Sequence, residues 1–126
     1  MELSNRRFAD VTVAAPAGRI DHPNAQSLQE ALAPILDDLR LTKGALLLDF
    51  EGVEYISSMG LRVLMMAAKQ MRSQGERVAV ASLQPAAAEI FEIARFKHVV
   101  EVFPSVRVAL QELSPAALAA YEAAAK

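Results

Sequence analysis

Hydrophobic residues recur along the chain with two different periods, and the switches between these periods predict alternating strands and helices. Alternation at Val11 and Val13 predicts a strand within residues 8–15, and residues 19–21 form a second short candidate strand. Residues 16–18, Pro-Ala-Gly, separate the two. Because the two strands are so close in sequence, we expect them to pair as a hairpin at one side of a sheet.

Helical periodicity begins after residue 24. One face of this first helix carries Leu28, Leu32, Ile35, Leu36 and Leu39. Pro34 lies inside the pattern and lacks a backbone donor, so we expect a kink or a late helix start. A second amphipathic helix follows and ends near Gly75, which is a typical C-terminal stop. Its predicted inner face is Leu61, Leu64, Met65, Ala68 and Met71.

The remaining segments continue the alternation of strands and helices. Residues 45–50 form an almost continuous apolar run, which is typical of a central strand covered on both faces. Residues 51–56 are expected to form a short acidic loop. A short strand at 78–81 precedes a helix that begins at Pro85 and turns Ile90, Ile93 and Ala94 inward. A last strand near 99–102 and an amphipathic helix over 106–113 complete the pattern.

This order, β-β-α-β-α-β-α-β-α, predicts a single α/β domain. We expect a mixed, mainly parallel sheet of about four or five strands with about four helices and right-handed crossovers. The predicted domain spans residues 1–113. The alanine-rich tail, residues 114–126, has high helix propensity but few apolar side chains to dock. We therefore expect it to be a weakly attached helix or a frayed end.

Composition narrows the possible functions. The 126 residues are 53% hydrophobic and 22% charged, as in an ordinary globular protein, and the net charge of −2 gives nucleic-acid binding no electrostatic support. Cysteine is absent, only two histidines occur, and no glycine-rich phosphate motif is present, so we expect no metal and no cofactor. The N-terminus does not resemble a signal peptide, and no stretch has the length of a membrane span. We therefore expect a cytoplasmic protein that does not insert into a membrane.

Polar groups converge where the central strand passes into the second helix. Asp49 ends the strand, and Ser57 and Ser58 stand at the helix start, beyond the carboxyl end of a parallel strand where functional groups gather. A serine there can simply be an N-cap. A helix N-terminus also favours negative charge, so a phosphate on either serine would be well accommodated and would add about −1.5 to −2 charge units.

An enzymatic interpretation is not favoured. Asp21 ends the second short strand beside His22, where it either reaches the same edge of the sheet or caps the following helix. A triad of Ser58, His22 and either Asp21 or Asp49 can be written. However, the sequence lacks the nucleophile elbow G-x-S-x-G, and no oxyanion arrangement can be recognised.

The outward side of the second helix carries Met59, Arg62 and Met66, close to Ser58. Methionine and arginine are both favoured in adaptable protein interfaces. Any one of these residues alone is an ordinary surface residue. Together, beside a possible modification site, they predict a surface that docks a partner protein.

These residues resemble a known family signature. Asp49, Gly52 and the run Ile56-Ser57-Ser58-Met59-Gly60-Leu61-Arg62 resemble the signature of the STAS domain, named for sulfate transporters and anti-sigma-factor antagonists. Residues 18–21, Gly-Arg-Ile-Asp, resemble the family's second landmark. The resemblance runs from about residue 8 to residue 113 and implies a mixed sheet with helices, which agrees with the order read from the periodicity.

The resemblance also implies a mechanism. In stand-alone bacterial members, an anti-sigma-factor serine kinase of the GHKL type phosphorylates the serine two residues before the signature glycine, here Ser58. The unphosphorylated protein binds the kinase and frees the sigma factor, phosphorylation ends this binding, and a PP2C-type phosphatase restores it. Ser57 stands where the sporulation antagonist has aspartate, Met59 where a small residue is common, and Glu51 where many relatives have serine. Ser57 therefore remains a second candidate acceptor.

Our leading hypothesis is therefore a non-catalytic anti-sigma-factor antagonist that is switched off by phosphorylation. The predicted partner-binding residues are Asp21, Asp49, Ser57, Ser58, Met59, Gly60, Arg62 and Met66. The alternative is a constitutive STAS subunit of a larger assembly, such as a lipid-transport ATPase complex or a stress-signalling scaffold. An enzyme is the third interpretation.

Overall fold

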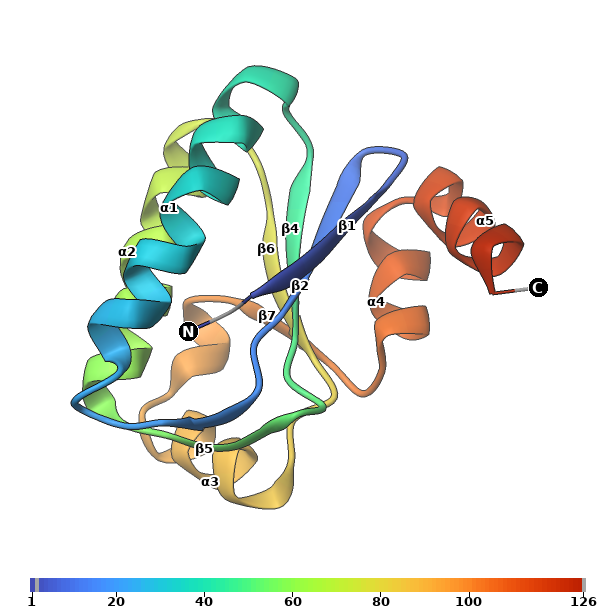
Figure 1. The fold of residues 1–126 in the computed structure, drawn as a ribbon. Helices are drawn as coiled ribbons and strands as arrows, with labels where there is room; N and C mark the ends of the chain where they lie inside the picture. Colours follow the sequence, from blue (N-terminus) through green and yellow to red (C-terminus); the bar gives the residue numbers. More distant parts are fainter. Residues whose placement is uncertain (2, 126) are drawn as a thin grey trace.

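A computed structural model, which describes residues 1 and 3–125, shows a five-stranded mixed sheet between two helical layers (Figure 1). The strand order is β1 (Ser4–Phe8), β2 (Val11–Ala15), β4 (Ala45–Asp49), β6 (Val78–Ala81) and β7 (Glu101–Phe103). β1 runs antiparallel to β2, and every other neighbouring pair is parallel. The predicted α/β class and the mixed, mainly parallel sheet are confirmed.

One face of the sheet is covered by α1 (Ala25–Thr42) and α2 (Ser58–Ser73), with α3 (Pro85–Ile93) and the 3-10 helix η1 (Phe96–His98) at its lower end. The other face is covered by α4 (Val106–Leu113) and α5 (Pro115–Ala124) (Figure 1). The central strand serves both layers because its side chains alternate. Leu46 and Leu48 belong to the core under α1 and α2, whereas Ala45 and Leu47 belong to the core under α4.

One predicted strand pairing and one predicted loop were wrong. The strand at 11–15 does not form a hairpin with β3 (Gly18–Ile20) but pairs with β1, which the hydrophobic pattern missed because four of its five residues are exposed. β3 pairs in parallel with β5 (Val53–Ile56) in a separate two-stranded ribbon. The predicted acidic loop therefore contains a strand. Val53 and Ile56 are buried while Glu54 points to solvent, and four residues are too few to establish a period.

The helices show a similar mixture of agreement and correction. The predicted apolar face of α1 is buried, but the helix starts at Ala25 and continues through Pro34, so the late start was wrong. Met65, expected in the core, is 45% exposed, and Ala67 is buried instead because α1 packs on that side of α2. In α3 the buried residues are Ala87 and Phe91. Ile90 is half-buried and packs against the core as predicted, whereas Ile93 and Ala94 are exposed. The last strand begins only at residue 101, because η1 occupies residues 96–98.

The C-terminal tail forms α5 and packs against β1 and α4 (Figure 1). Ser114 is buried and caps this helix, since its hydroxyl oxygen accepts a hydrogen bond from the Ala117 N–H at 3.1 Å while the hydroxyl donates to Asp10. The Tyr121 ring meets Phe8 edge-on, with 5.4 Å between the ring centroids. Within residues 1 and 3–125, no helix combines the length and the apolar character that a membrane crossing needs.

Candidate functional site

The start of α2 is held by the β3–β5 ribbon at the end of the molecule where β2 and β4 finish (Figure 1). Ser57 follows β5 directly, and its N–H donates to the carbonyl of Ile20 at 2.7 Å. The Gly18 N–H donates to the carbonyl of Gly52 at 2.7 Å on the same ribbon. The two landmarks of the sequence, residues 18–21 and 52–60, are therefore joined by backbone hydrogen bonds, and this junction positions the helix start.

The two serines have different structural roles. Ser57 is the N-cap of α2, with extended backbone angles (φ −82°, ψ 169°), and its Oγ accepts a hydrogen bond from the Gly60 N–H at 3.2 Å. Its side chain is partly buried. Ser58 is the first residue of the helix, and its side chain is exposed. The cap hydroxyl is therefore committed to the fold, whereas the next hydroxyl along the chain faces solvent.

This division predicts a difference in stability between two alanine variants. Ser57→Ala removes the cap and is expected to lower the free energy of unfolding by about 1 kcal/mol. Ser58→Ala removes an exposed hydroxyl and is expected to change it by less than about 0.5 kcal/mol. Urea unfolding followed by circular dichroism measures both. A larger loss from Ser58→Ala than from Ser57→Ala would show that the roles are assigned the wrong way round.

Gly60 allows the first turn of α2 to approach the ribbon closely. It is buried, and a Cβ atom at this position would lie 2.7 Å from Cγ1 of Ile56 and 2.8 Å from Cγ2 of Ile20. Both contacted atoms belong to β-branched side chains that are fully buried and have little rotameric freedom. The glycine therefore sets the distance between the first turn of α2 and the β3–β5 ribbon. This distance in turn determines how far Ser58 projects into solvent.

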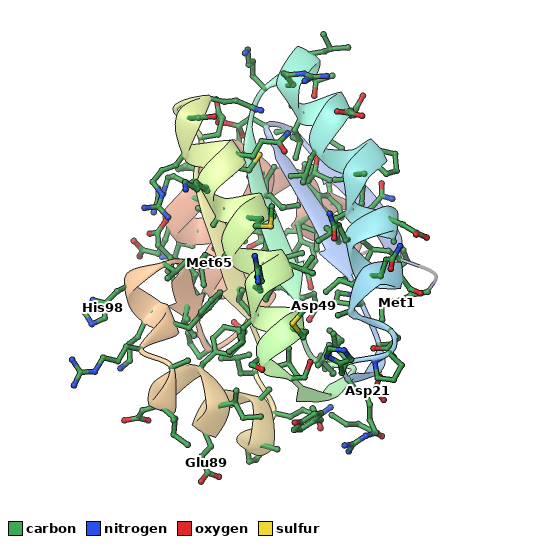
Figure 2. The ribbon with its side chains drawn as sticks, turned by 90° about the vertical axis from the view of Figure 1, so that its left-hand side faces the viewer. Met1, Asp21, Asp49, Met65, Glu89 and His98 are labelled. Carbon is green, nitrogen blue, oxygen red and sulfur yellow. The ribbon has the colours of Figure 1, made fainter. Side chains whose placement is uncertain are left out.

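The exposed side of α2 continues from Ser58 as a partly apolar surface. We define the α2 face as Ser58, Met59, Arg62, Met65 and Met66, all of which are exposed. Three of these are large apolar side chains, with exposed fractions of 38% for Met59, 45% for Met65 and 55% for Met66. The sequence pattern did not predict that Met65 is exposed, because residue 65 also fits the period of the buried face of the helix. Figure 2 shows it on the side of α2 toward η1, which carries His98.

Asp21 lies at the same end of the molecule as the start of α2, as Figure 2 shows. It follows Ile20, whose carbonyl receives the Ser57 N–H, so the fold brings Asp21 and Ser57 near each other. Its Oδ1 accepts a hydrogen bond from the Asn24 N–H at 3.3 Å, and Asn24 Nδ2 in turn donates to the Arg19 carbonyl at 2.6 Å. The carboxylate thus shapes the turn that leads into α1, but it does not cap the helix, because the N-cap residue is Asn24 and the N–H that Asp21 accepts from is that of Asn24 itself.

Asp49 is not brought together with the serines. It has the same parity on β4 as Leu47, so its side chain faces the α4–α5 side of the sheet. There it lines a cavity of about 230 Å³ together with Arg6, Val106 and Tyr121. Its Oδ1 also accepts a hydrogen bond from the Glu51 N–H at 3.1 Å, a turn of the Asx type. Asp49 therefore organises the turn after β4 and does not contribute to the α2 face.

The catalytic alternative receives no support from this geometry. Asp49 points to the other side of the sheet, and the carboxylate of Asp21 is used by a backbone N–H, so neither orients His22 toward Ser58. The geometry does not support a metal centre either, because residues 1 and 3–125 contain no group of three or more His, Asp or Glu side chains that could hold an ion. The site is a surface with one exposed hydroxyl at a helix start.

Comparison with known proteins identifies the family. Residues 3–109 match the STAS domain. The chain is 36% identical over 107 residues to BtrV of Bordetella bronchiseptica, a candidate anti-sigma factor antagonist, and the match covers 82% of this chain and 84% of that protein.

Two solved structures share the fold. A candidate anti-sigma factor antagonist from Thermotoga maritima superposes with a TM-score of 0.79 at 19% identity, covering 88% of this chain and 93% of that chain. The unphosphorylated form of the anti-sigma factor antagonist SpoIIAA superposes with a TM-score of 0.64 at 10% identity, covering 87% and 94%. The match over residues 3–109 and the 36% identity to BtrV show that the chain belongs to the STAS domain family.

Proposed function

We propose that this protein is an anti-sigma-factor antagonist, a non-catalytic binding module whose switch is phosphorylation of Ser58. The observation that carries the proposal is the division of roles at the start of α2, where Ser57 is used as the N-cap and Ser58 is exposed. The similarity to BtrV supports this class of function. The proposed partners are an anti-sigma-factor serine kinase of the GHKL type and a PP2C-type phosphatase.

A phosphate on Ser58 is compatible with the fold as it stands. It would lie at the N-terminus of α2, where the free N–H groups and the helix dipole favour negative charge. Arg62 is exposed one turn further along and has the spacing for an i, i+4 ion pair with the phosphate. Phosphorylation therefore need not unfold or rearrange α2. Its effect would be to change the charge of the surface that the partner contacts.

The α2 face is the proposed docking surface for the kinase. Its three exposed methionines supply adaptable apolar contact area, and Arg62 supplies a charged anchor. A phosphate beside them adds about −1.5 to −2 charge units that binding would have to desolvate or oppose. Asp21 lies at the same end of the molecule as the start of α2, whereas Asp49 faces the other side of the sheet and is left out of the proposed surface.

Phosphate transfer in vitro tests the acceptor assignment. The purified protein is incubated with ATP and GHKL-type serine kinases encoded near its gene, and intact-mass spectrometry counts the phosphates added. We expect one phosphate on the wild type and on Ser57→Ala, and none on Ser58→Ala. Modification of Ser57 in the wild type would overturn the assignment. A stable complex with unmodified Ser58 and no transfer would instead indicate the constitutive subunit.

A further inference from the structure

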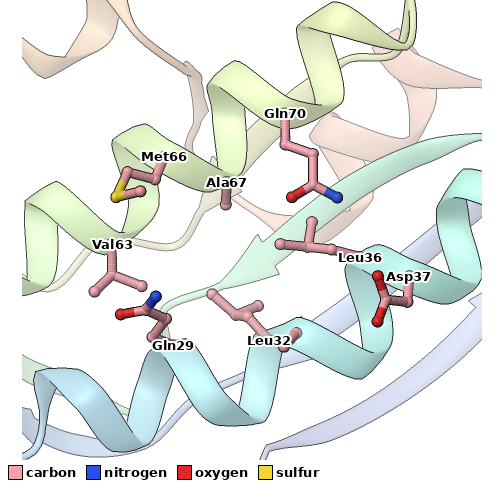
Figure 3. Close-up of a pocket in the computed structure, with 9 residues that line it drawn as sticks. Gln29, Leu32, Leu36, Asp37, Val63, Met66, Ala67 and Gln70 are labelled. Atoms are coloured by element: carbon pink, nitrogen blue, oxygen red, sulfur yellow. The ribbon is translucent and has the colours of Figure 1, made fainter.

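A groove runs between α1 and α2, and Figure 3 shows the residues that line its upper part. Its upper part has a volume of about 190 Å³ and lies between Leu32 and Leu36 of α1 and Met66 and Ala67 of α2. Its lower part has a volume of about 560 Å³ and reaches down to His22 and Met59. The two parts share Gln29, Ala33 and Val63, so they form one continuous channel along the helix pair.

The groove exists because small side chains line both of its walls. Ala33 on α1 is exposed and Ala67 on α2 is 4% exposed, and neither is long enough to close the space between the helices. Leu32 and Leu36 lie beneath as an apolar floor and are 1% and 8% exposed. Because this floor is buried, the apolar surface that an incoming group would meet is supplied by the walls, where Ala33 is exposed and Met66 is 55% exposed.

The charge of the lining restricts what enters. Among the described residues that line the groove, the charged ones are Glu30 and Asp37, and none is a lysine or arginine. The two carboxylates are seven residues apart on α1, which places them two turns apart, or about 10 Å along the axis. Asp37 pairs with Arg40 at 3.2 Å, but the two side chains are 66% and 60% exposed, so a partner's cation can replace this weak contact.

We infer that the α1–α2 groove binds an amphipathic helix of a partner protein that carries aliphatic side chains between two basic residues. A channel that runs along two helices, with an apolar floor and a flexible methionine on its rim, has the features of helix-in-groove recognition. Lysine or arginine residues two turns apart on the guest helix would match Glu30 and Asp37. The groove shares Met59 and Met66 with the α2 face, but Ser58 does not line it, so this inference does not depend on the phosphorylation switch.

A designed helical peptide tests the inference without any kinase. The probe is an alanine-based peptide with leucines at i, i+3 and i+4 and lysines two turns apart, labelled for fluorescence anisotropy. Its matched counterpart has glutamate in place of both lysines. We expect the lysine probe to bind and the glutamate probe to bind about tenfold more weakly or not at all. In ¹⁵N-labelled protein, the amide shifts caused by the lysine probe should cluster on residues 29–37 and 59–70.

Three variants decide whether the groove is the binding site. Ala33→Phe fills the channel from an exposed position and should weaken probe binding about tenfold or more. Its matched control, Ala119→Phe, places the same ring at an exposed position on α5 and should leave binding unchanged. The pair Glu30→Gln and Asp37→Asn together should remove the preference for the lysine probe.

Each contrary result is equally clear. No binding of the lysine probe, equal binding of both probes, or full affinity in Ala33→Phe would overturn the inference. Analytical ultracentrifugation of the protein without peptide tests whether a second copy of the chain occupies the groove instead. Self-association that Ala33→Phe abolishes would show that a second copy of the chain fills the groove, which also overturns it.

Discussion

Replacing Ser58 by aspartate is expected to weaken binding to the anti-sigma-factor serine kinase about 30-fold or more, which corresponds to about 2 kcal/mol. The new carboxylate stands on the α2 face among Met59, Arg62 and Met66, where the proposed interface would exclude water. A charge placed there has to be desolvated or has to meet the partner's own charges, and like charges brought together cost several kcal/mol. Phosphoserine carries more charge than aspartate, so its effect should be larger.

Isothermal titration with the purified kinase and ADP measures this effect. Ser58→Ala should bind within about threefold of the wild type, since it removes only one exposed hydroxyl. Ser73→Asp is the matched control, because Ser73 is also exposed on α2 but lies at the other end of the helix, in its last turn. Wild-type affinity in Ser58→Asp, or an equal loss in Ser73→Asp, would show that the switch does not act through the α2 face.

Replacing Gly60 by valine should destabilise the fold by about 3 kcal/mol. The first added carbon already comes within 2.8 Å of Ile20 and Ile56, and two further methyl groups deepen the overlap. Neither isoleucine has room to move, since both are fully buried in the core under α1 and α2. The strain should also lift the start of α2 away from the ribbon, so kinase binding should weaken at temperatures where the variant is still folded.

Thermal and urea unfolding measure the loss of stability. Lys69→Val is the matched control, because it places the same β-branched side chain at an exposed position in the middle of α2 and should cost less than about 1 kcal/mol. A Gly60→Val protein as stable as Lys69→Val would mean that the approach between α2 and the β3–β5 ribbon is looser than the structure shows.

Features that depend on neighbouring residues could be predicted from the sequence. The apolar face of α1 repeats over three turns, the run at residues 45–50 has no polar break before Asp49, and Gly75 ends α2 with a positive φ of 76°. The position of Ser57 and Ser58 at a helix start was equally visible. Each of these signals comes from a period or from the conformational preference of a single residue. It therefore does not depend on which other segments pack against it.

Short or exposed segments gave no comparable signal. β1 has four exposed residues and β5 has only four residues in all, so neither shows a period, and both are strands because a partner strand satisfies their backbone groups. Met65 fits either side of α2, and only the packing of α1 against that helix leaves it in solvent. For such residues the local pattern is ambiguous, and packing resolves it.

The candidate site shows the same division. Local sequence was enough to place a hydroxyl, a glycine and a methionine-rich surface at the start of one helix, because all of them lie within one or two turns of each other. It could not show that Ser57 is used as the cap while Ser58 is free, that Asp49 turns to the opposite face of the sheet, or that two alanines leave a groove between α1 and α2. These features depend on side-chain direction and on contacts between segments far apart in the chain, which exist only once the sheet and its two helical layers have assembled.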